Sequence, residues 1–306
     1  MKQHNNLSRR HFVAVLGTAA ATVPLLHAGN VLAADSGKSL LPLDTPRVDH
    51  LDVMVPNVES SARFYMSVFK TSLHAQPFQG GQRYFVLLGD LPANRQVGYL
   101  AIGDSRGRGN YIGHFCTSVF NYRENAAALT EQMKEAFSKA GFGDITSVSR
   151  GGVAGIFADP DGIELQFLPA PDTLVTVAVP SQLVEWNQGM LTPKGVDHAL
   201  LKVSDMKKAL QFYRTLYGKK DYRDKKKSGR VWFPIGPTRL GLEEVQYQFG
   251  DKPRIAHFGI QVAPFDRAAV TEGLRKLGAE ILPSDDEPDV LRFKDLDGIT
   301  LEVRAV

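Results

Sequence analysis

The chain has 306 residues, of which 43% are hydrophobic and 23% are charged, a globular composition that excludes collagen-like, coiled-coil and disordered chains. Its length favours two domains, and its single Cys excludes a disulfide framework and a cysteine-based zinc or iron–sulfur site. The formal net charge is +3, but the three basic residues of the first 34 account for it, since the remaining 33 Lys and Arg match 33 Asp and Glu. Because the chain after residue 34 has no net charge, nucleic acid is not expected as a partner.

The first 34 residues are predicted to be an export signal. Arg9 and Arg10 precede an apolar stretch at 13–26, and residues 31–33 form a small-residue cleavage pattern, with 32–34 as a second register. The paired arginines resemble a twin-arginine signal, and the apolar stretch is too short for a membrane span of ~20 residues. We therefore expect the twin-arginine export machinery to move the protein into the periplasm or out of the cell, with loss of 1–34.

The rest of the chain repeats itself with an offset of 148 residues. Val-Asp-His occurs at 48–50 and at 196–198, and Phe-Tyr occurs at 64–65 and at 212–213. The apolar residues between these two motifs are spaced as in a helix, so each copy is predicted to begin with a strand and an amphipathic helix. Each copy also ends in an Asp-x-Asp-Gly-Ile turn that leads into an apolar strand.

A second strand and helix are predicted inside each copy. Ile-Gly-His-Phe at 112–115 precedes a helix around 123–140, and Ile-Ala-His-Phe at 255–258 precedes one around 266–277. Short β-rich runs fill the remainder, so we expect an α+β fold of four βαβββ modules, each with a strand, a helix and about three strands. The modules pair into two domains, with these boundaries: first domain 47–170, Pro-containing linker 171–194, second domain 195–306.

This organisation resembles the vicinal oxygen chelate superfamily, which includes glyoxalase I, type I extradiol dioxygenases, methylmalonyl-CoA epimerase and the fosfomycin- and bleomycin-resistance proteins. The resemblance covers nearly all of 47–306 and is carried by the strand–His–helix starts and the Asp-Pro-Asp-Gly turn at 159–162. It implies two domains with curved mixed sheets that surround one divalent metal ion. It also implies a small-molecule substrate that is held through two oxygen atoms.

Four histidines occupy the same place, the middle of a module's first strand: His50, His114, His198 and His257. Either they ligate a metal or they are core residues that were copied by duplication. In the second half the resemblance adds Glu302, on the last strand, as a carboxylate ligand. The resulting two-His, one-carboxylate site suits Fe2+, Mn2+, Ni2+, Co2+ or Zn2+ and leaves positions open for substrate.

A fourth ligand is expected from Glu243-Glu244, where bacterial glyoxalase I carries a Glu, and we favour Glu244. The alternative is a solvated acid at a strand end. Glu302 or Glu244 is also the candidate base for proton transfer.

The first half departs from this pattern, because spacing from the final turn places Gln166 where a carboxylate is expected. Glu164, two residues earlier, shares its predicted face. The first half thus offers a second metal site made of His50, His114 and either Gln166 or Glu164. The alternative is a vestigial site.

The expected activity is Lewis-acid chemistry by a lyase or isomerase of the glyoxalase or epimerase type. Ring-cleaving members need a Tyr three residues before the final Asp, but Ile156 and Arg292 stand there, and no His follows His257. Dioxygenase chemistry stays open. The alternative is a small-molecule binding protein of the bleomycin-resistance type, which sequesters its ligand without metal. The sequence leaves a homodimer open.

Overall fold

The computed structural model describes residues 39–78, 80–89, 98–143, 147–150, 154–170, 182–184, 186, 189–284 and 287–306. The predicted export signal lies outside these residues. Within Gly37–Val306 the described residues form one compact unit. No helix in the described ranges is long and apolar enough to cross a membrane.

The first half forms a nine-stranded mixed sheet in the order β6-β7-β8-β5-β1-β4-β3-β2-β9. Its elements are β1 (Arg47–Val55), α1 (Val58–Val68), β2 (Leu73–Phe78), β3 (Gly81–Leu87), β4 (Tyr99–Asp104), β5 (Tyr111–Phe120), α2 (Tyr122–Lys139), β6 (Ser147–Arg150), β7 (Ala154–Ala158), β8 (Glu164–Ala170) and β9 (Gln182–Val184).

The second half forms an eight-stranded mixed sheet in the order β11-β12-β13-β10-β14-β17-β16-β15. Its elements are β10 (Thr192–Val203), α4 (Met206–Tyr217), β11 (Tyr222–Arg223), β12 (Val231–Ile235), β13 (Thr238–Glu244), η3 (Tyr247–Phe249), β14 (Arg254–Ala263), α5 (Arg267–Lys276), β15 (Glu280–Leu282), β16 (Val290–Lys294) and β17 (Thr300–Ala305).

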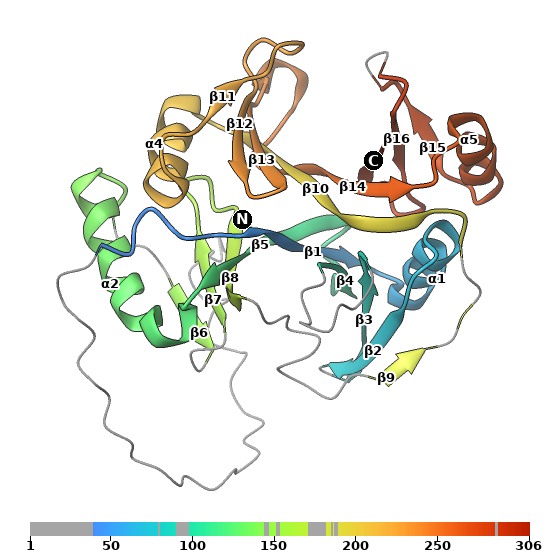
Figure 1. Ribbon diagram of the computed structural model, residues 1–306, viewed down its shortest axis with the longest axis horizontal. Coiled ribbons are helices and arrows are strands. Elements are labelled where there is room, and N and C mark those ends of the chain that lie inside the picture. The colour runs from blue at the N-terminus through green and yellow to red at the C-terminus, as the bar shows by residue number, and fades with distance from the viewer. Residues whose placement is uncertain are drawn as a thin grey trace, which may run out of the picture. The chain divides into compact units, whose positions relative to one another are not determined.

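The four predicted βαβββ modules and the α+β fold class are confirmed (Figure 1). In each sheet the first strands of two modules lie antiparallel to each other, β1 beside β5 and β10 beside β14. Each sheet is mixed because β1 also runs parallel to β4, and β10 to β13. These central strands carry the four histidines, so the topology brings two histidines together in each sheet.

The predicted linker contributes a strand that the sequence did not indicate. Residues 182–184 form β9, which pairs antiparallel with β2 and covers the edge of the first sheet. The chain then returns along α1, where Met190 and Leu191 donate backbone hydrogen bonds to the Val68 carbonyl.

The repeated Phe-Tyr motif joins the two halves. The Tyr65 hydroxyl of α1 donates to Asp295 Oδ2 at 2.5 Å, and the Tyr213 hydroxyl of α4 donates to Asp159 Oδ2 at 2.9 Å. Each Asp opens an Asp-x-Asp-Gly turn of the opposite half, and its Oδ1 accepts two backbone N–H groups of that turn. We call these two Tyr–Asp contacts the reciprocal latch.

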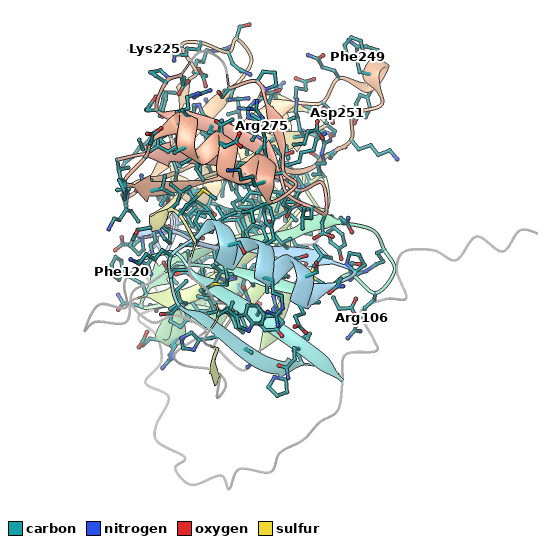
Figure 2. All side chains as sticks on the ribbon, turned by 90° about the vertical axis from the view of Figure 1, so that its right-hand side faces the viewer. Arg106, Phe120, Lys225, Phe249, Asp251 and Arg275 are labelled. Atoms are coloured by element: carbon teal, nitrogen blue, oxygen red, sulfur yellow. The ribbon has the colours of Figure 1, made fainter. Side chains whose placement is uncertain are left out.

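One hydrophobic core runs through both halves, from β1 and α1 to β14 and β17. Phe64 of α1, for example, packs against Phe293 of β16 with ring centroids 6.5 Å apart. Large apolar side chains at the periphery are few, and Figure 2 marks Phe120 and Phe249, which are 41% and 78% exposed. The shared core and the reciprocal latch fix the two sheets to one another.

Candidate metal centre

Three predicted ligands of the second half lie together. His198 of β10 is in register with Gly259 of β14, and Gly259 is in register with Glu302 of β17. A Cβ atom on Gly259 would lie 2.4 Å from the His198 ring, so the ring occupies the space above a residue without a side chain. The His198 ring thereby reaches across β14 toward Glu302.

The functional atoms of this second-half cluster, His198, His257 and Glu302, converge in a buried space. His198 Nε2 lies 3.6 Å from Glu302 Oε2, and His257 Nε2 lies 3.4 Å from Glu302 Oε1. The three residues are 1%, 6% and 5% exposed. Both Nε2 atoms are buried without a hydrogen-bond partner, although buried polar atoms are almost always satisfied. Two imidazoles and one carboxylate that point into the same space form a donor set that fits a divalent cation.

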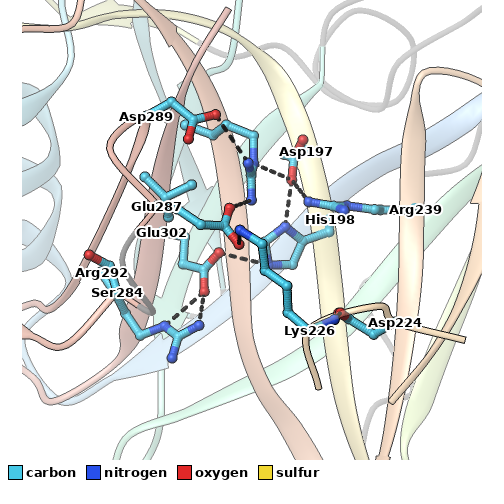
Figure 3. A network of polar contacts seen from close by, with 12 residues as sticks. Asp197, His198, Asp224, Lys226, Arg239, Ser284, Glu287, Asp289, Arg292 and Glu302 are labelled. Carbon is cyan, nitrogen blue, oxygen red and sulfur yellow. Dashed lines mark hydrogen bonds and ion pairs between the residues drawn. The ribbon is translucent and has the colours of Figure 1, made fainter. Parts of the chain in front are cut away.

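Asp197 fixes the orientation of His198. Adjacent strand residues normally point to opposite faces, but a register shift between Val196 and His198 marks a bulge that lets Asp197 reach its neighbour. Asp197 Oδ2 lies 2.7 Å from His198 Nδ1 and accepts a bond from Arg239 at 2.9 Å (Figure 3). Nδ1 then carries the proton and Nε2 keeps its lone pair. Burial alone would raise the pKa of Asp197, but the His198 bond and the Arg239 charge hold it well below its usual value.

Arg292 is a site residue that the sequence did not identify as a partner of Glu302. It lies opposite Glu302 in register, and its guanidinium donates from Nε at 2.7 Å and from Nη2 to Oε1 (Figure 3). Burial would raise the pKa of Glu302, but His198, His257 and Arg292 lower it to about 2. A signal for this contact was present in the sequence, because a hairpin that turns at 295–298 places position 292 opposite position 302.

Glu244 does not join the second-half cluster. It is exposed at the end of β13 and in register with Val203, a core residue whose face is opposite to that of His198. Its neighbour Glu243 lies on the His198 face, but it ion-pairs with Lys202 and with Arg230. The strand therefore brings no fourth carboxylate to the cluster.

The first half brings His50, His114 and Gln166 together, and we call them the first-half cluster. His114 Nε2 lies 3.2 Å from His50 Nε2 and 3.1 Å from Gln166 Oε1. Glu164 is exposed at the start of β8, so Gln166 takes the place of Glu302. Asp49 Oδ1 lies 3.0 Å from His50 Nδ1, as Asp197 lies against His198.

The two clusters differ in what surrounds their histidines. In the first half, Cys116 stands in register between His50 and Gln166, where the second half has Gly259, and it is fully buried. The His50 ring stacks on Tyr99 at 4.2 Å. The Nε2 atoms of the first-half cluster face each other and Gln166 at hydrogen-bond distance, whereas those of the second-half cluster have no hydrogen-bond partner. The unpartnered nitrogens of the second-half cluster fit an ion more directly.

Comparison with known proteins identifies one family. The family model described as "Glyoxalase/Bleomycin resistance protein/Dioxygenase superfamily" matches residues 47–167 and 195–303. No curated protein matches the chain.

Solved structures with this fold are distant in sequence. The 2,3-dioxygenase LapB from Pseudomonas sp. KL28 is 15% identical, with a TM-score of 0.62 over 87% of this chain and 93% of that chain. The Mn(II)-bound glyoxalase from Novosphingobium aromaticivorans is 13% identical, with a TM-score of 0.60 over 85% and 82%. Homoprotocatechuate 2,3-dioxygenase from Arthrobacter globiformis is 17% identical, with a TM-score of 0.56 over 87% and 81%. These likenesses show a shared fold.

Proposed function

Because the chain belongs to the glyoxalase/bleomycin resistance protein/dioxygenase superfamily, we propose that it is a divalent-metal-dependent enzyme with His198, His257 and Glu302 as ligands. The observation that carries the proposal is the convergence of two unpartnered Nε2 atoms on a buried carboxylate. The donor set suits Fe2+, Mn2+, Ni2+, Co2+ or Zn2+, and such an ion supplies Lewis-acid polarisation of substrate oxygens.

The residues of the cluster favour a lyase or isomerase of the glyoxalase or epimerase type. Arg292 stands where ring-cleaving members need a Tyr, and the sequence holds no His after His257. A guanidinium does not give up a proton at physiological pH, so Arg292 binds and orients while a carboxylate must carry protons. Glu302 is placed for that role. Its pKa of about 2 makes it a weak base, so its role as ligand is the stronger part of the proposal.

Metal content per chain tests this proposal. We expect about one ion per chain in protein purified under conditions that preserve Fe2+, loss of that ion in His257→Ala, and retention in the matched variant His114→Ala. Far-UV circular dichroism of each variant separates loss of a ligand from loss of the fold. Loss of metal in His114→Ala alone would place the site in the first half.

A small-molecule binding protein is the second candidate function, and the first-half cluster favours it. His114 Nε2 lies within hydrogen-bond distance of His50 Nε2 and of Gln166 Oε1, and a proton on one Nε2 can make such a contact without an ion. We also propose the first-half cluster as a weaker second metal site, which a metal content of two per chain would support. Binding of an aromatic ligand by protein free of metal would instead favour sequestration.

We further propose export by the twin-arginine machinery, on the strength of Arg9 and Arg10 and the cleavage pattern at 31–33. The mass of the mature protein is the direct test, and we expect it to begin at Ala34 or Asp35. Replacement of both arginines by Lys should leave the full-length chain inside the cell. A mature protein that keeps residues 1–34 would contradict the proposal.

A further inference from the structure

Arg292 has a carboxylate partner that belongs to the proposed ligand set. Its guanidinium donates twice to Glu302 Oε1, whereas Arg230 pairs with Glu243 and Arg239 pairs with Asp197. The Arg292 side chain is 17% exposed and that of Glu302 is 6% exposed. Arg292 is therefore the more exposed member of this buried pair.

Arg292 and a bound ion would share the Glu302 carboxylate. Oε1 accepts both Arg292 bonds and also lies 3.4 Å from His257 Nε2. Oε2 accepts neither Arg292 bond and lies 3.6 Å from His198 Nε2, so an ion held by both histidines could use Oε2 while Arg292 stays beside Oε1. The guanidinium has five donors in a planar fork, and the pairing of β16 with β17 keeps it beside the cluster.

The first half shows that the fold itself does not require a positively charged side chain at the position of Arg292. Ile156 is in register with Gln166, as Arg292 is with Glu302. A charged side chain opposite a neutral amide would lack a partner, and a partly buried unpaired charge is costly. The arginine thus occurs opposite the cluster that has a carboxylate.

We propose that Arg292 anchors an anionic oxygen of the substrate beside the metal centre. A guanidinium can donate two charge-assisted hydrogen bonds to one carboxylate oxygen, as Arg292 does to Glu302 Oε1. The substrate class is then a small 2-hydroxy or 2-oxo carboxylate, which offers two chelating oxygens and a third oxygen to Arg292, and not a neutral carbonyl compound. This inference rests on the proposed metal-dependent function.

Two probes that share their chelating oxygens but differ in charge test the assignment. Glycolate and glycolamide are titrated into Mn2+-loaded protein, and displacement of metal-bound water is followed by proton relaxation. In Arg292→Met we expect the glycolate affinity to fall about tenfold or more, while the glycolamide affinity stays within about twofold. The control Lys294→Met removes a positive charge two residues along β16 that pairs with Glu280, and both affinities should stay within about threefold.

The Mn2+ affinity is measured first, in the same samples. We expect Arg292→Met to bind Mn2+ at least as tightly as the wild type, because a positive charge beside the ligand Glu302 is gone. Loss of Mn2+ with an unchanged circular dichroism spectrum would show that Arg292 only positions Glu302, and would overturn the proposal.

The remaining outcomes are also decisive. An equal fall of both probe affinities, or a wild type that binds neither probe, would refute anion anchoring while the metal proposal stands. A wild type that binds no Mn2+ would refute the proposed function as well. Should Arg292→Met fail to fold, Arg292→Lys keeps the charge but loses the fork, and unchanged glycolate binding in that variant would overturn the role of the guanidinium.

Discussion

The metal centre requires a residue without a side chain at position 259, and Gly259 meets this requirement. The His198 ring lies over it, and a Cβ atom would meet that ring at 2.4 Å. We predict that Gly259→Ala lowers the affinity for Mn2+ or Co2+ at least about tenfold, because His198 must leave its position, at a folding cost of about 1–3 kcal/mol. Metal titration and thermal unfolding measure the two effects.

Gly103→Ala is the matched control for that prediction. Its Cβ atom would lie 3.2 Å from the Sδ atom of Met54, a flexible side chain that can move away. We expect this variant to bind metal as the wild type does. Equal affinities in Gly259→Ala and Gly103→Ala would contradict the geometry described for His198.

Asp197 orients the ligand His198 through a hydrogen bond with its Nδ1 atom. Its carboxylate accepts from His198 Nδ1 at 2.7 Å, and loss of such a partner typically weakens metal binding about 10–100-fold. We predict a fall of that size in Asp197→Asn, measured by metal titration, while Asp49→Asn leaves the second-half affinity unchanged. An unchanged affinity in Asp197→Asn would show that the bulge does not orient His198 for the metal.

The site residues also show which parts of the metal centre could be predicted from the sequence. His198 and His257 were predictable because a His recurs in the middle of each module's first strand, and Glu302 because the family resemblance implies a carboxylate on the last strand. Glu243 and Glu244 were not separable, since the face of a residue at a strand end depends on register with β10. Arg292 was noted only as the absence of a Tyr, because its partner comes from a neighbouring strand.

At the scale of elements, the reciprocal latch fixes two helices to the turns of the opposite halves. We predict that Tyr65→Phe and Tyr213→Phe each lower the free energy of unfolding by about 1.5–3 kcal/mol, the range for a hydrogen bond to a charged group. Urea unfolding measures both. The control Tyr84→Phe removes a hydroxyl from a side chain that packs against Trp186 and should change stability by less than about 0.5 kcal/mol. Two latch variants no less stable than the control would contradict the prediction.

The elements themselves were largely predictable, and the exceptions have physical reasons. The helices α1, α2, α4 and α5 begin and end within a few residues of their expected positions, because each has a clear apolar stripe and α1, α4 and α5 have a side-chain N-cap. The strand β9 was not predicted. It has three residues, too few for a periodic pattern, and it forms because β2 offers an open edge.

For the whole molecule, the latch predicts a dependence of stability on pH. Burial raises the pKa of Asp159 and of Asp295 to about 6, from 3.8, despite the bonds from Tyr213 and Tyr65. A pKa raised by folding contributes stability that is full below pH 3.8 and is lost as the pH rises through 6. The loss is on the order of 1–3 kcal/mol for each Asp.

The double variant Asp159→Asn, Asp295→Asn isolates this contribution. An Asn side chain keeps the oxygen that accepts the backbone N–H groups of each turn and does not titrate. As the pH rises from about 4 to 6, the variant should therefore become more stable relative to the wild type, which loses this contribution. Urea unfolding at several pH values measures the difference. A difference that does not change with pH would contradict the assignment, whatever the other carboxylates contribute, because these are common to both proteins.

The reciprocal latch also bears on whether the covalent connection between the halves is needed. Each half supplies a tyrosine to the other, the hydrophobic core is continuous across them, and β9 pairs with the first sheet although it precedes β10 in the chain. A chain cut between Ala170 and Gln182 should therefore yield two fragments that assemble without a peptide bond. The protein then behaves as a heterodimer whose subunits are translated as one polypeptide, and co-expression of the two fragments would recover it.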